Sequence, residues 1–119
     1  TYYVGVYGQY ALAGYADLEA PAVSSDEFRH LDKSTAEDLV LAISQSGETY
    51  DSTMSLRHAK ARGARTAAIV NVMGSSIARM VDRVVLQGSG PEVCVVSTKA
   101  ALVQMVLLTR LALELGERR

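Results

Sequence analysis

The fold is decided by residues 38–49, DLVLAISQSGET. The first seven of these residues form a short, nearly continuous apolar run, which is typical of a strand buried in a parallel sheet. Residues 45–48 are expected to form a turn, and residues 49–62 a helix that Gly63 terminates. A strand that leads through a tight turn into a helix is the first half of a βαβ unit.

The rest of the chain repeats this alternation of strands and helices. Strands are also expected over residues 66–72, 83–87 and, more briefly, 22–24, with a loop or short strand at 88–96. Helical segments are also expected over residues 2–18, 25–28, 74–81 and 97–115, the last capped by Ser97 and ended by Gly116. This pattern predicts an α/β fold with a parallel sheet. The 119 residues fit one domain, residues 1–119.

Five of the six tyrosines fall in the first expected helix. Tyr3, Tyr7, Tyr10 and Gly14 recur there at helical spacing, as do Val4, Ala11, Tyr15 and Leu18. Such a stripe predicts a face that packs against the core, and stacking against a ligand is the alternative.

The composition excludes several classes of protein. It is 49% hydrophobic and 21% charged, which is typical of a soluble globular protein. The net charge of −1 lacks the basic excess of a nucleic-acid binder. The most apolar run, residues 100–115, is interrupted by polar and charged residues and is too short to cross a membrane. No nucleic-acid or membrane partner is therefore expected.

Cys94 is the only cysteine, so an intramolecular disulfide and a cysteine-based metal site are ruled out. One unpaired cysteine favours a reducing, cytoplasmic location. His30 and His58 have no metal-ligand spacing. The motif search finds no Walker A sequence and no GxGxxG after a strand. We therefore expect neither a metal nor a cofactor.

The clearest chemistry lies in residues 44–49, SQSGET. Serine and threonine hydroxyls, a glycine that allows close backbone approach, and a helix N-terminus together suit an anion such as phosphate. The alternative is that Ser46 simply caps the helix. Glu48 would be repelled by a phosphate, so it is expected to point away and favour the helix N-terminus.

Two further segments have the same layout. Residues 71–76, NVMGSS, follow one expected strand, and residues 97–99, STK, begin the last helix. Both could line the same crevice, because ligands of open α/β sheets lie beyond the carboxyl ends of the strands. Plain helix capping is the alternative for each.

Together, SSDEFR (24–29), ISQSGET (43–49), NVMGSS (71–76) and EVCVVSTKA (92–100) resemble the first SIS (sugar isomerase) domain of the glucosamine-6-phosphate synthases, which are glutamine–fructose-6-phosphate aminotransferases. The resemblance covers nearly the whole chain. It implies a doubly wound three-layer α/β sandwich with a five-stranded parallel sheet in flavodoxin-like order. The first strand of that sheet would precede Thr1, in a longer chain of which this sequence is a fragment.

The resemblance also implies a ligand, a hexose 6-phosphate such as fructose 6-phosphate or glucosamine 6-phosphate. The phosphate would be held by five residues: Thr1, Ser44, Gln45, Ser46 and Thr49. The sugar would be contacted by Val95 and Ser97. Departures from the family pattern at Asp26, Met73, Val96 and residues 79–82 lie outside the phosphate turn and bear on sugar selectivity.

In the family, the catalytic base, ring-opening histidine and Schiff-base lysine lie in a second SIS domain or the C-terminal tail. They are therefore not assigned to Glu48, His58 or Lys99, and this chain alone is expected to bind without catalysing. A homodimer or a second SIS domain is expected to pack on the apolar last helix. A sugar-phosphate-sensing module without catalysis and a stand-alone phosphosugar isomerase are the alternatives.

Overall fold

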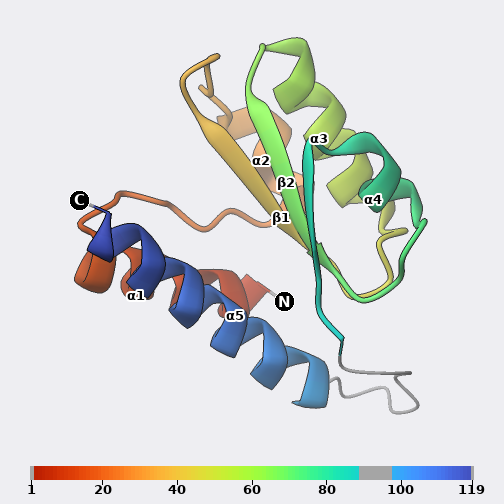
Figure 1. Ribbon diagram of the computed structural model, residues 1–119. Coiled ribbons are helices and arrows are strands. Elements are labelled where there is room, and N and C mark those ends of the chain that lie inside the picture. Colours follow the sequence, from red (N-terminus) through yellow and green to blue (C-terminus); the bar gives the residue numbers. More distant parts are fainter. Residues whose placement is uncertain (1, 89–97, 119) are drawn as a thin grey trace. The chain divides into compact units, whose positions relative to one another are not determined.

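The computed structural model describes residues 2–88 and 98–118 (Figure 1). The described elements form two compact units. One unit contains α1 (Tyr2–Ala16) and α5 (Thr98–Glu117). The other contains α2 (Ser25–Leu31), β1 (Leu39–Ile43), α3 (Tyr50–Ala61), β2 (Arg65–Val70), α4 (Ser76–Met80) and β3 (Arg83–Leu86).

The three strands form a parallel sheet in the order β1-β2-β3. Leu39 lies opposite Arg65 and Ile43 opposite Ile69, so β1 and β2 end together at their carboxyl edge. The prediction of an α/β fold with a parallel sheet is confirmed. The predicted five strands are not confirmed, because the sheet has three strands in the part of the chain described here.

The core of this unit lies between one face of the sheet and helices α3 and α4. Ala68 and Val70, two residues apart on β2, pack with Leu56 of α3 and Ile77 of α4. Leu56 and Ile77 are at most 1% exposed. Burial of each such side chain contributes about 1.5–3 kcal/mol to the stability of the fold. The cluster therefore holds α3 and α4 against the sheet, and with them the turns that precede these helices.

Two expectations for strands were wrong. Residues 22–24 form no strand, and Ser24 is instead the N-cap of α2. A strand so short has few ladder hydrogen bonds to gain. β1 was expected to be buried, but Leu39 is 57% exposed and the other four residues are half-buried, because β1 is an edge strand of the described sheet.

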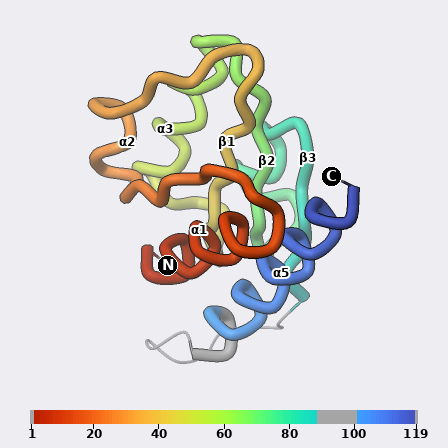
Figure 2. Tube along the Cα trace, turned by 90° about the vertical axis from the view of Figure 1, so that its left-hand side faces the viewer, coloured from red at the N-terminus to blue at the C-terminus, as the bar shows by residue number. Residues whose placement is uncertain are grey.

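In the other unit, α1 and α5 lie side by side (Figures 1 and 2). The contact is made by small residues, since a Cβ atom on Gly8 would lie 3.1 Å from Leu108 Cδ1. Val4 and Ala11 are buried, and the Tyr7 hydroxyl is hydrogen-bonded to Thr109 of α5, whereas Tyr3 and Tyr10 are 83% and 75% exposed. The predicted packing face is therefore confirmed for Val4 and Ala11 and wrong for Tyr3 and Tyr10.

The end of the last helix also differs from the expectation. Gly116 does not terminate α5 but lies within it. A Cβ atom at this position would collide with the backbone carbonyl oxygen of Tyr15. The glycine is thus needed for close approach of α1 rather than for a helix stop. No helix among residues 2–88 and 98–118 is long and apolar enough to span a membrane.

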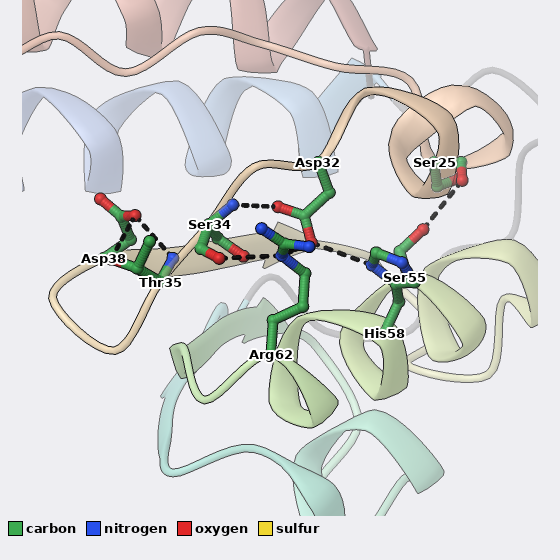
Figure 3. A network of polar contacts seen from close by, with 8 residues as sticks. All are labelled: Ser25, Asp32, Ser34, Thr35, Asp38, Ser55, His58 and Arg62. Atoms are coloured by element: carbon green, nitrogen blue, oxygen red, sulfur yellow. Dashed lines mark hydrogen bonds and ion pairs between the residues drawn. The ribbon is translucent and has the colours of Figure 1, made fainter.

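A buried carboxylate ties the loop before β1 to α3 (Figure 3). The Asp32 side chain is 3% exposed, and its Oδ2 lies 2.9 Å from His58 Nδ1. Asp32 Oδ1 accepts a hydrogen bond from the Ser34 N–H, and Arg62 Nε donates to the Ser34 carbonyl. Burial raises the pKa of Asp32, but contacts with Ser34 and His58 outweigh it and hold the pKa below its ordinary value.

Candidate functional site

The SQSGET segment forms the turn between β1 and α3, as predicted. Its first residue, Ser44, is buried and donates its N–H to the Ile69 carbonyl at the end of the sheet ladder. A second turn, residues 71–75, joins β2 to α4. Because β1 and β2 are parallel and in register, the two turns leave the sheet at the same edge.

The Ser44 hydroxyl organises the first turn from within. It accepts a hydrogen bond from the Gly47 N–H at 3.1 Å and lies 3.0 Å from the Thr49 hydroxyl. A hydrogen bond between two hydroxyls uses only one of their two protons. One hydroxyl proton of this pair therefore remains to be donated to a ligand.

The exposed surface of the turn carries Ser46 and Thr49. Ser46 Oγ accepts a hydrogen bond from the Glu48 N–H at 3.1 Å. The N-cap of α3 is Thr49, and its side chain makes no capping hydrogen bond. The alternative that Ser46 caps the helix is therefore wrong. The buried amide oxygen of Gln45 has no hydrogen-bond partner among the described residues.

The start of α3 supplies further donors. The first N–H groups of any α-helix lack an intrahelical acceptor and carry a partial positive charge. In α3 these belong to the turn that follows Thr49, next to the hydroxyls of the SQSGET segment. The arrangement can hold an anion by hydrogen bonds from neutral groups.

The second turn is interlocked with the first. The Asn71 N–H donates to the Gln45 carbonyl and the Ile77 N–H to the Gly47 carbonyl, each at 2.9 Å. Gly47 has a φ of +70°, and a Cβ atom there would collide with the side chain of Ser75. A glycine is thus required both by the backbone conformation and by the close approach of α4.

Ser75 behaves as the plain-cap alternative predicted for this segment, since its side chain accepts from the Ala78 N–H at 3.3 Å. Glu48 differs from the expectation in its partner. Its carboxylate binds the N–H and hydroxyl of Ser76 at the start of α4, rather than the N-terminus of its own helix α3. The Ser76 hydroxyl and N–H hold the pKa of Glu48 below its ordinary value.

Comparison with known proteins identifies the family. The model of the SIS domain family matches residues 1–114 of the chain. The chain belongs to the SIS domain family. The turns at residues 44–49 and 71–75 are the first two strand-to-helix turns in the described part of this SIS domain.

Relatives of this SIS domain are found among aminotransferases. It is 44% identical over 123 residues to glutamine–fructose-6-phosphate aminotransferase (isomerizing) of Streptomyces coelicolor, covering 100% of this chain and 20% of that protein. It is 42% identical over 119 residues to the protein of that name from Fusobacterium nucleatum, covering 99% of this chain and 20% of that protein. The chain therefore spans about a fifth of the length of these relatives.

A solved structure agrees with these relatives. The C-terminal domain of glucosamine-fructose-6-phosphate aminotransferase from Francisella tularensis matches with a TM-score of 0.90 at 32% identity. The match covers 98% of this chain and 33% of that chain. The likeness confirms the predicted SIS fold and the resemblance to this branch of the family.

The SIS domain brings together four of the seven predicted site residues: Ser44, Gln45, Ser46 and Thr49. Thr1, Val95 and Ser97 lie outside the described residues, so their roles stay predictions. Among the described residues, no group of three or more His, Cys, Asp and Glu side chains could hold a metal ion. The sequence reasoning missed the Glu48–Ser76 contact, because nothing in the spacing of 28 residues signals it.

Proposed function

We propose that this SIS domain binds a hexose 6-phosphate, either fructose 6-phosphate or glucosamine 6-phosphate. The observation that carries the proposal is the turn at Ser44–Thr49, where a hydroxyl proton and the first N–H groups of α3 are available at one edge of the sheet. The names of the relatives support a phosphorylated hexose as the ligand class.

Within the proposed site, Ser44, Gln45, Ser46 and Thr49 hold the phosphate, and Ser44 also fixes the turn through its contacts with Gly47 and Thr49. Thr1 is proposed to reach the same phosphate. Val95, through its backbone, and Ser97 are proposed to contact the sugar. Three neutral hydroxyls and the N-terminus of α3 can compensate a phosphate charge without a lysine or arginine.

We further propose that the domain is the isomerase-half portion of a cytoplasmic glutamine–fructose-6-phosphate aminotransferase, and that alone it binds without turnover. Isomerisation needs a base within about 3 Å of the proton that it moves. Glu48, the carboxylate of the SQSGET turn, is instead engaged by Ser76. The catalytic groups would then come from elsewhere in the parent protein.

The expected partner, a second SIS domain or a second copy, is proposed to pack on α5. Leu108 and Ala112 of this helix are buried, but Leu102 and Val106 are 61% and 60% exposed. Apolar side chains exposed on a helix are candidates for a contact surface.

Isothermal titration calorimetry of the full-length protein tests the proposed ligand. Glucosamine 6-phosphate should bind, whereas glucosamine, which lacks the phosphate, should bind far more weakly. Equal affinity for the two compounds would contradict a phosphate site, and the absence of binding would contradict the proposed function as a whole.

A further inference from the structure

One acidic side chain joins the two turns at the carboxyl edge of the sheet. Glu48 Oε1 accepts a hydrogen bond from the Ser76 N–H at 2.8 Å, and Oε2 accepts one from the Ser76 hydroxyl at 2.6 Å. Hydrogen bonds to an ionised group are roughly twice as strong as neutral ones. Glu48 thereby links the SQSGET turn to the first residue of α4.

The other contacts between the turns act on the backbone of the SQSGET segment. The N–H groups of Asn71 and Ile77 donate to the carbonyls of Gln45 and Gly47. Glu48 adds a side-chain contact directly before Thr49. The backbone N–H of Glu48 also donates a hydrogen bond to Ser46 Oγ. Glu48 is thus linked to both exposed hydroxyl residues of the turn, to Ser46 by this hydrogen bond and to Thr49 as its neighbour in the chain.

A carboxylate beside a phosphate would ordinarily weaken binding by repulsion. Here its charge is already met by the two donors of Ser76, and the positive charge of Arg79 also favours the ionised form. The Glu48 carboxylate is therefore bonded to the first residue of α4 and is not directed at the ligand.

We propose that Glu48 is a positioning residue for the phosphate site: by binding Ser76 it fixes the end of the SQSGET turn, and with it the hydroxyls of Ser46, to which its N–H is bonded, and of the adjacent Thr49. This inference rests on the proposed function. It assigns to Glu48 neither contact with the substrate nor proton transfer.

The test compares dissociation constants of two probes, glucosamine 6-phosphate and inorganic phosphate, for full-length variants. Glu48→Ala should weaken binding of both probes by the same factor, about tenfold. Glu48→Gln should restore most of the affinity, because its amide can accept from the Ser76 N–H and donate to the Ser76 hydroxyl. Asp51→Asn is the charge-matched control, since Asp51 lies in the first turn of α3, and it should not weaken binding.

A double-mutant cycle provides an independent measurement. Ser76→Ala should weaken binding less than Glu48→Ala, because the Ser76 N–H remains, and the two effects should not add in the double variant. This coupling must be seen in the dissociation constants, not only in the melting temperatures.

Four outcomes would overturn the inference. The first is an unchanged dissociation constant in Glu48→Ala, even with a lowered melting temperature, since that would mean a purely structural role. The second is tighter binding in Glu48→Ala and Glu48→Gln alike, which would mean simple charge repulsion. The third is a loss confined to the sugar phosphate, which would mean contact with the sugar. The fourth, no binding of either probe by the unmodified protein, would also overturn the proposed function, whereas the first three leave it intact.

Discussion

The hydroxyl oxygens of Ser44 and Thr49 lie 3.0 Å apart and close the SQSGET turn from inside. Ser44 is buried and Thr49 is exposed, so the bond connects the end of β1 to the exposed side of the turn. Thr49 also begins α3 as its N-cap without a side-chain capping bond. The Thr49 hydroxyl therefore does not cap α3, and its contact with Ser44 positions it.

This relationship predicts the behaviour of variants at Thr49. Thr49→Val, which keeps the shape but removes the hydroxyl, should weaken binding of glucosamine 6-phosphate by about 10- to 150-fold, because a hydrogen bond to a charged group contributes about 1.5–3 kcal/mol. Thr49→Ser keeps the hydroxyl and is the matched control. Calorimetry that finds the two variants equal in affinity would show that the hydroxyl does not contact the ligand.

Gly47 should not tolerate a side chain. In Gly47→Ala the new Cβ atom would collide with Ser75 and separate the two turns, so both stability and affinity should fall. Gly88→Ala is the control, because Gly88 has the same φ of +70° but no described residue lies within 4 Å of an added Cβ. It should show only the backbone strain of about 1–2 kcal/mol in urea unfolding and no loss of affinity. Equal effects of the two substitutions would contradict the close packing of the turns.

The Asp32 cluster predicts a pH dependence of stability. The pKa of Asp32 is lowered in the folded protein, so its contribution is present above the unfolded pKa of about 3.9 and is lost as the pH falls through the folded pKa. Asp32→Asn should lower the free energy of unfolding by about 1–3 kcal/mol near pH 6, where the carboxylate is ionised. The difference from the unmodified protein should shrink below about pH 4.

Denaturant titrations over this pH range check the Asp32 prediction. Asp17→Asn is the control, because Asp17 is exposed and its positive φ of 54° suits asparagine. A difference between Asp32→Asn and the unmodified protein that stays constant with pH would show that the charge of Asp32 plays no part.

The exposed apolar side of α5 predicts an association surface. Val106→Glu should shift the full-length protein toward a smaller assembly, since a charge at an apolar contact has to be desolvated. Tyr10→Glu, on the exposed side of α1, is the matched control and should leave the assembly unchanged. Light scattering that finds a monomer before and after the Val106 change would refute the surface.

The sequence was most informative where local pattern decides the structure. The apolar run before Ser44 and the glycine after Arg62 predicted β1 and the end of α3 to within about one residue, because strand burial and helix termination leave local signals. The turn at Ser44–Thr49 was found for the same reason. Its internal bond between Ser44 and Thr49 could not be read from hydroxyl content alone.

Long-range packing was less predictable. The periodic tyrosines of α1 suggested a buried face, but the buried residues of this helix are Val4, Gly8, Ala11 and Ala16, and α5 approaches closely at Gly8. The same close approach explains why Gly116 lies within a helix instead of ending it. The contact of Glu48 with Ser76 joins residues of two separate turns and depends on the register of β1 with β2.

The most direct test of the phosphate site is calorimetric titration of glucosamine 6-phosphate into the Ser46→Ala variant of the full-length protein. Ser46 lies on the exposed side of the turn, so its loss should remove a ligand contact while the fold is kept. Ser25→Ala serves as control, because only the backbone carbonyl of Ser25 is used, by Ser55. The dissociation constant should rise by about 10- to 150-fold for Ser46→Ala and stay unchanged for the control. An unchanged dissociation constant in Ser46→Ala would contradict the assignment of this turn to the phosphate.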